Sequence, residues 1–217
     1  MPNDPKNANQ LKRCGCVGCS HALLLHLQVV RGMSLKQALG WSVWPYILAE
    51  FDMAFLSKTN EAVGMPSRNL LPPVVLNLLV FIASQTNPSW AGTLNLVYGY
   101  WSLGNSVPML FFPEFAIQLW GCPNVNTYIG RLLVRSIGYF LLSHGVSVLV
   151  LCQGGGMANA IGLSALAVAV SLAGLIVTGQ FDNNVPNPKE PAYPWILLLL
   201  AIANSLLGGG AVGTGSV

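Results

Sequence analysis

Long apolar runs separated by short polar segments are the main pattern of this sequence. Four runs approach the length of a membrane span, at residues 92–112, 128–152, 158–178 and 195–207. A helix needs about 20 apolar residues to cross the hydrocarbon layer, because lipid offers no hydrogen-bond partner to an unpaired backbone. The pattern predicts an all-α, polytopic integral membrane protein, with about 4 to 6 transmembrane helices joined by interfacial connector helices.

Two other apolar segments are interrupted or short. Residues 35–57 are long enough to span, but Pro45 predicts a kink, and Glu50 and Asp52 exclude lipid from at least one face. Residues 69–84 form a short embedded helix in our interpretation. Two prolines fit its first turn, where a missing N–H costs least.

The N-terminal segment looks different from the rest. Residues 2–20 are polar and rich in glycine and cysteine, which predicts an exposed loop, and residues 21–30 are too short to span and predict an interfacial helix. We therefore divide the chain into a polar N-terminal segment (1–34) and a helical membrane domain (35–217). The last two helices of that domain are expected at 157–180 and 194–213.

A shift of 57 residues suggests an internal repeat of the halves 35–88 and 92–152. It aligns a "GxPxxN" motif at residues 64–69 with one at 121–126, and Trp44 with Trp101. Repeated halves occur in transporters, where the binding site lies at the repeat interface. They equally mark a duplicated scaffold. Small residues four apart in 158–178 predict close packing of that helix on protein.

Composition supports the membrane class and excludes others. Of 217 residues, 53% are hydrophobic and 8% charged, against about a quarter charged in a soluble domain. The net charge of +3 is scattered over several loops and too sparse for nucleic acid. Five cysteines without a framework spacing do not predict a disulfide scaffold. The first residues do not resemble a secretory signal or a transit peptide, which favours the mitochondrial inner membrane over the thylakoid.

Arg131 and Arg135 share one helix face at the start of an apolar run. Long basic side chains at such a position reach the headgroup layer. The pair predicts an interfacial anchor or a binding site for anionic lipid, and acidic residues on a neighbouring helix are the alternative.

His144 lies about 13 Å deeper than Arg135 along the same helix, near the middle of the bilayer. An ionisable residue there is a functional hypothesis by default. A neutral imidazole bonded to an adjacent helix is the first interpretation, and axial ligation of a haem or chlorophyll-type pigment or a place in a proton path are the others. No second histidine is expected at pairing distance. No cofactor is firmly predicted, although structural lipids are expected.

Three thiols and an imidazole cluster in "CGCVGCSH". Thiolates and imidazole are the ligands that zinc prefers, so Cys14, Cys16, Cys19 and His21 are a candidate metal site. Their spacing is not that of a standard zinc finger, and ordinary reduced cysteines are the simpler interpretation.

The stretch "RSIGYFLLSH" (135–144) resembles an element of ATP synthase subunit a, in which an essential arginine is followed nine positions later by an acid or histidine. The resemblance implies a role in proton conduction. It covers ten residues, and Tyr139 stands where the family usually has asparagine. At about 100° per residue, Arg135 and His144 also point to opposite helix faces.

The sequence favours a non-catalytic accessory subunit of a larger organellar bioenergetic complex, associated with other membrane subunits and anionic lipid. Short or kinked apolar segments and small-residue rows support this hypothesis. A small transporter or proton-channel component is the alternative, and it predicts that Glu50, Asp52, Arg135 and His144 converge on one cavity. Binding of haem or pigment through His144 is a third.

Overall fold

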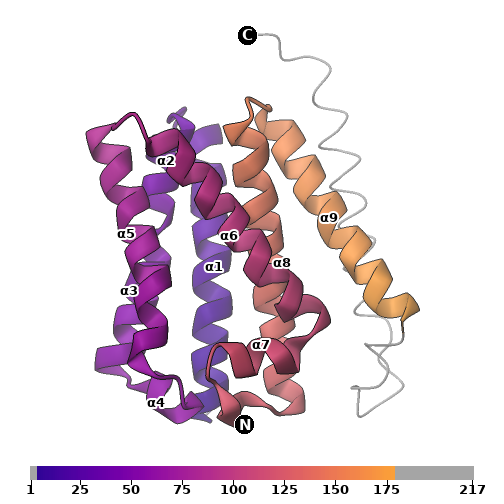
Figure 1. Cartoon of the computed structure of the whole chain (residues 1–217). Helices are drawn as coiled ribbons and strands as arrows, with labels where there is room; N and C mark the ends of the chain where they lie inside the picture. The colour runs from indigo at the N-terminus through magenta and orange to yellow at the C-terminus, as the bar shows by residue number, and fades with distance from the viewer. Residues whose placement is uncertain (1–3, 179–217) are drawn as a thin grey trace.

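The computed structural model describes residues 4–178, and within them the chain is all-α. The elements form an upright bundle of long helices with short helices at one end (Figure 1). In chain order they are α1 (Pro5–Val29), α2 (Leu35–Ser42), α3 (Trp44–Phe51), the π-helical turn η1 (Asp52–Leu56), α4 (Thr59–Val63), η2 (Ser67–Leu70), α5 (Leu71–Thr86), α6 (Ala91–Phe111), α7 (Pro113–Leu119), η3 (Pro123–Val125), α8 (Tyr128–Cys152) and α9 (Met157–Val177).

Helix α1 runs through the centre of the bundle (Figure 1). The side chain of Asp4 caps its first turn by accepting from the Lys6 backbone N–H, and Pro5 occupies the first helical position. The helix packs against α2, α3, α4 and α8. The expected exposed loop at 2–20 and separate short helix at 21–30 are therefore wrong. The polar residues of α1 meet polar partners on other elements, which the local sequence does not reveal.

Prolines divide the next segments as the sequence predicts. The helix at 35–57 breaks at Val43, and Pro45 lies in the first turn of α3. The continuation of α3 is a π-helical turn, which ends at Leu56. Both prolines of α5 also fall in its first turn, which confirms their predicted position.

Three helices of the described chain are long and apolar enough to cross a membrane: α5 with the preceding turn (Arg68–Thr86), α8 and α9. The chain therefore belongs to the helical membrane proteins. Helix α6, which the sequence predicts as a span, is not among these three, yet it has 21 residues and packs along α8. The span expected at 195–207 lies outside the described residues.

Small residues bring the long helices together. A Cβ at Gly145 of α8 would lie 3.0 Å from the backbone oxygen of Gly99 on α6, so the two backbones approach closely at this point. On α9, Ala160, Gly162 and Ser164 are buried, and the helix packs against α8. The predicted small-residue packing surface is thus in contact with protein.

The two halves repeat the same order of elements. Helices α5 and α8 begin 57 positions apart, and each follows a "GxPxxN" turn. Both turns start with a left-handed glycine, Gly64 at φ 81° and Gly121 at φ 69°. The turns pack on each other reciprocally: a Cβ on Gly64 would lie 3.3 Å from Pro123, and one on Gly121 would lie 3.0 Å from Pro66. Figure 1 shows both turns at the same end of the bundle, so the halves run in parallel.

The turn glycines should be sensitive to added side chains. Gly121→Ala places a Cβ 2.9 Å from the Asn69 amide nitrogen and forces a left-handed conformation that costs roughly 1–2 kcal/mol in an L-residue. We expect the free energy of unfolding in detergent to fall by at least that amount. The control is Gly104→Ala on α6, where a Cβ meets nothing within 4 Å. It should be neutral or stabilising, by up to about 1 kcal/mol.

Candidate functional site

A buried ion pair joins α1 to α3. Arg13 is 9% exposed and Glu50 is 2% exposed. The two terminal guanidinium nitrogens of Arg13 both donate to the Glu50 carboxylate. This bidentate geometry is the one that best compensates the loss of water around two charges. Glu50 is therefore buried against α1, on a face of α3 from which lipid is excluded, as the sequence predicts.

Two asparagines complete the network around Arg13. Its Nε donates to the Asn9 side chain at 3.1 Å, and Nη2 donates to the Asn60 side chain on α4 at 2.9 Å. Asn9 in turn donates to Asn60 at 2.8 Å. Both asparagines are buried. The network therefore connects α1, α3 and α4 through direct hydrogen bonds between buried side chains.

A second ion pair lies on the surface beside the first. Lys12 of α1 donates to the carboxylate of Asp52, and both side chains remain more than a third exposed. Such a pair is worth about 0–1 kcal/mol. The two acidic residues near the end of α3 thus have different roles. Glu50 joins α1 to α3 inside the bundle, whereas Asp52 joins α1 to η1 at the surface.

Arg131 and Arg135 line one groove, as their shared helix face predicts. The groove has a volume of about 340 Å³ and is otherwise lined by residues 111–115, which include three phenylalanines. Arg131 forms an ion pair with Glu114 at 3.3 Å and donates to Asn126 at 3.0 Å. Arg135 is buried, and its Nε donates to the backbone oxygen of Leu110 at 3.1 Å. The acidic residue of the alternative interpretation is therefore present beside Arg131, and the lipid site stays a prediction.

His144 is buried at 1% exposure and meets a second histidine. The His21 ring on α1 lies 5.7 Å from the His144 ring, centroid to centroid, in an edge-to-face arrangement. The expectation that no second histidine lies near is wrong, since helix packing joins residues far apart in the chain. Tyr98 packs edge-on against His144 at 5.6 Å. Rings in direct contact on a packed helix pair leave no slot for a macrocycle, so these residues do not fit a haem between them.

The cysteine cluster does not form a metal site in the structure. Cys14, Cys16, Cys19 and His21 all lie on the continuous helix α1, where residues two apart point in nearly opposite directions. Cys16 is buried while Cys19 is exposed. Among residues 4–178, no three histidine, cysteine or acidic side chains gather as metal ligands. Helical geometry thus separates what the sequence places side by side.

The four side chains of the transport hypothesis lie apart. Glu50 binds Arg13, Asp52 binds Lys12, Arg135 lines the groove and His144 packs on His21. Each therefore has its own partner, although the Glu50 and Asp52 pairs lie side by side. Sequence reasoning missed Arg13, Asn9 and Asn60 altogether. The four-residue spacing of Asn9 and Arg13, behind a capped helix start, was the available signal.

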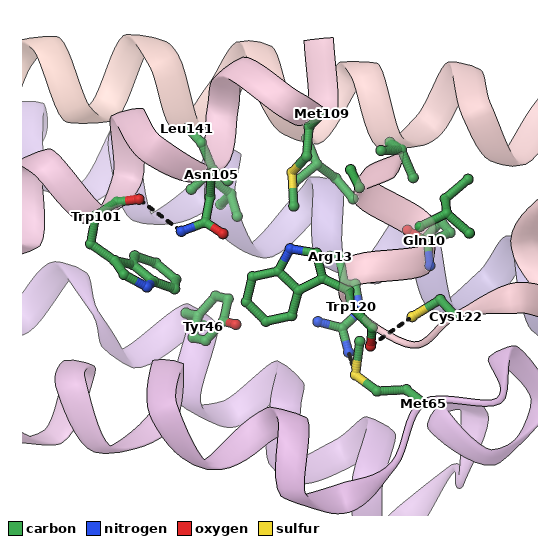
Figure 2. Close-up of a pocket in the computed structure, with 15 residues that line it drawn as sticks. Gln10, Arg13, Tyr46, Met65, Trp101, Asn105, Met109, Trp120, Cys122 and Leu141 are labelled. Atoms are coloured by element: carbon green, nitrogen blue, oxygen red, sulfur yellow. Dashed lines mark hydrogen bonds between the residues drawn. The ribbon is translucent and has the colours of Figure 1, made fainter. Parts of the chain in front are cut away.

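A cavity of about 60 Å³ lies next to the ion pair. Figure 2 shows the Trp120 indole in its centre, with Tyr46 and Asn105 to one side and Arg13 to the other. The indole ring of Trp120 packs edge-to-face against Trp101 at 6.4 Å. The cavity therefore has aromatic walls, and Glu50 neutralises the charge of the Arg13 side chain beside it.

Comparison of the chain with protein-family models, with curated proteins and with solved structures finds no match. The interpretation therefore depends on the geometry of this chain.

Removing one partner of the buried pair should destabilise the fold strongly. Glu50→Gln leaves the Arg13 guanidinium buried without a counter-charge, and such changes cost about 3–5 kcal/mol. The matched control is Asp52→Asn, which breaks the exposed pair with Lys12 and should cost at most about 1 kcal/mol. Both are read from unfolding curves in detergent. Equal losses of unfolding free energy in the two variants would show that the buried pair stabilises the fold no more than the exposed pair does.

Proposed function

We propose that this chain is a non-catalytic accessory subunit of a larger bioenergetic complex in an organellar membrane, and that it binds anionic lipid at the Arg131–Arg135 groove. The observation that carries the proposal is the groove itself. Two arginines at the start of a spanning helix face the same space as three phenylalanines. This is the chemistry that a phospholipid requires, with cations for the headgroup phosphate and apolar rings for the acyl chains.

The depth of the groove supports lipid as its ligand. Arg131 and Arg135 occupy the first two turns of α8, about 6 Å apart along the axis, which is the region of the headgroups if α8 spans. Basic pockets between membrane helices are known to bind lipid headgroups such as cardiolipin. The mitochondrial inner membrane, which the N-terminal sequence favours over the thylakoid, is the location that we propose.

The state of the polar core supports an accessory role over a catalytic one. In the buried ion pair, Arg13 and Glu50 are bound to each other, and Arg13 is also bound to the buried Asn9 and Asn60. Buried charged groups that already bind each other make the packing of the helices rigid and are not available for a reaction. Several helices also carry exposed leucine, valine and phenylalanine side chains on their outer faces. These faces suit lipid or the helices of partner subunits.

Lipid binding is tested with the purified chain in nanodiscs of phosphatidylcholine, with and without cardiolipin. Native mass spectrometry should show cardiolipin retained on the wild-type chain after release from the disc. Arg131→Gln should reduce retention about tenfold, since it removes one charge-assisted phosphate contact. We use Arg131 because Arg135 is buried and its loss could disturb packing.

The matched control is Arg68→Gln, an exposed arginine at the start of the other apolar helix in the equivalent half. It should leave retention unchanged. Equal loss in both variants would indicate general attraction to anionic lipid rather than a site. The accessory role is tested separately, because the chain extracted from its native membrane with mild detergent should migrate with a complex far larger than 23.1 kDa. Migration of the chain alone would contradict that role.

A further inference from the structure

The cavity beside the ion pair lies between the two repeated halves. Met65 of the first "GxPxxN" turn and Cys122 of the second occupy equivalent positions, and both line it. Helices α1 and α8 form its other walls, through residues such as Val17 and Ile137. The cavity thus forms where α1 and both halves pack together.

The walls of the cavity are largely aromatic and aliphatic, with a few polar atoms. The indole N–H of Trp120 is buried and has no hydrogen-bond partner. A buried donor left unpaired costs about 1–3 kcal/mol, so an acceptor in the cavity would be stabilised there. Asn105 uses its amide nitrogen to donate to the Trp101 backbone oxygen at 2.8 Å, and its amide oxygen faces the same space (Figure 2).

The charge of the site excludes an ionic ligand. Arg13 lines the cavity, but its guanidinium donates to Glu50, Asn9 and Asn60. The pair has no net charge. A charged ligand would enter an apolar space without a counter-ion, which is strongly unfavourable.

The surroundings of the cavity indicate where a ligand comes from. Tyr46 of α3 and Trp101 and Asn105 of α6 line the cavity and are only half-buried, so a ligand could reach it between these two helices. Both helices also carry exposed apolar side chains, Leu48 on α3 and Val107 on α6. A ligand would enter from the hydrocarbon layer rather than from water.

We propose that the cavity between the two halves binds an uncharged, lipid-soluble molecule through a small hydroxyl or carbonyl head group, which accepts a hydrogen bond from the Trp120 indole N–H. The volume of about 60 Å³ exceeds the roughly 10–15 Å³ that one water requires. It accommodates a compact head group, while a longer tail would leave between α3 and α6. The site is separate from the lipid groove, so either proposal can fail alone.

Tribromoethanol is a suitable probe, because it is small, uncharged and lipid-soluble, carries a hydroxyl group and quenches indole fluorescence on contact. In detergent, the wild-type chain should show a saturable component of quenching, from Trp101 and Trp120, above the linear background of micelle partition. Ala116→Leu fills the cavity while keeping every tryptophan and should abolish the saturable component. Ala173→Leu on α9, outside the cavity, is the matched control and should retain it.

Asn105→Leu provides a second variant with a side chain of the same branching but without the amide, in case Ala116→Leu does not fold. Loss of one hydrogen bond to the head group should weaken the saturable component about fivefold. Thermal unfolding of each variant checks the fold. Quenching that is linear in probe concentration for the wild type, or saturable quenching unchanged in the folded variants, would overturn the proposal and leave only partition into the micelle or ordered water in the cavity.

Discussion

The Arg13–Glu50 pair is the interaction on which the rest of the structure depends. Helix α1 is only partly apolar, and it lies at the centre of the bundle because its polar face finds partners there. Removing two charges from water costs several kcal/mol per ion, and only bidentate geometry with further hydrogen bonds compensates it. Asn9 and Asn60 supply those bonds. Once α1 is fixed, α3, α4 and α8 have a common surface on which to pack.

The duplicated turns and the central cavity follow from this arrangement. Two parallel halves meet through reciprocal contacts of Gly64 and Gly121, and Arg13 lies beside these turns, where it contacts Met65. Helix α1 precedes both halves and packs against elements of each, α2, α3 and α4 in the first and α8 in the second. The central cavity lies between α1 and these halves. The groove lined by Arg131 and Arg135, by contrast, lies where α6 turns into α7.

Much of the fold could be predicted from the sequence, because membrane thickness sets the length of an apolar helix. The observed bounds of α6, α8 and α9 fall within a few residues of the predicted ones, and Pro45 breaks the helix as expected. Helix α1 could not be predicted in this way, since Arg13 meets partners 37 and 47 positions away. The shared face of Arg131 and Arg135 follows from local helical geometry, whereas the meeting of His21 with His144 depends on packing between distant helices.

The central claim is that α1 is a buried helix held by its polar network. Hydrogen–deuterium exchange of the intact chain in detergent tests it most directly, because exposed loops exchange at once and buried helices only on opening. The account predicts that amides of α1 around Arg13 exchange as slowly as those in the middle of α8. Exchange of residues 5–20 at the rate of an unstructured peptide, with α8 still protected, would contradict it.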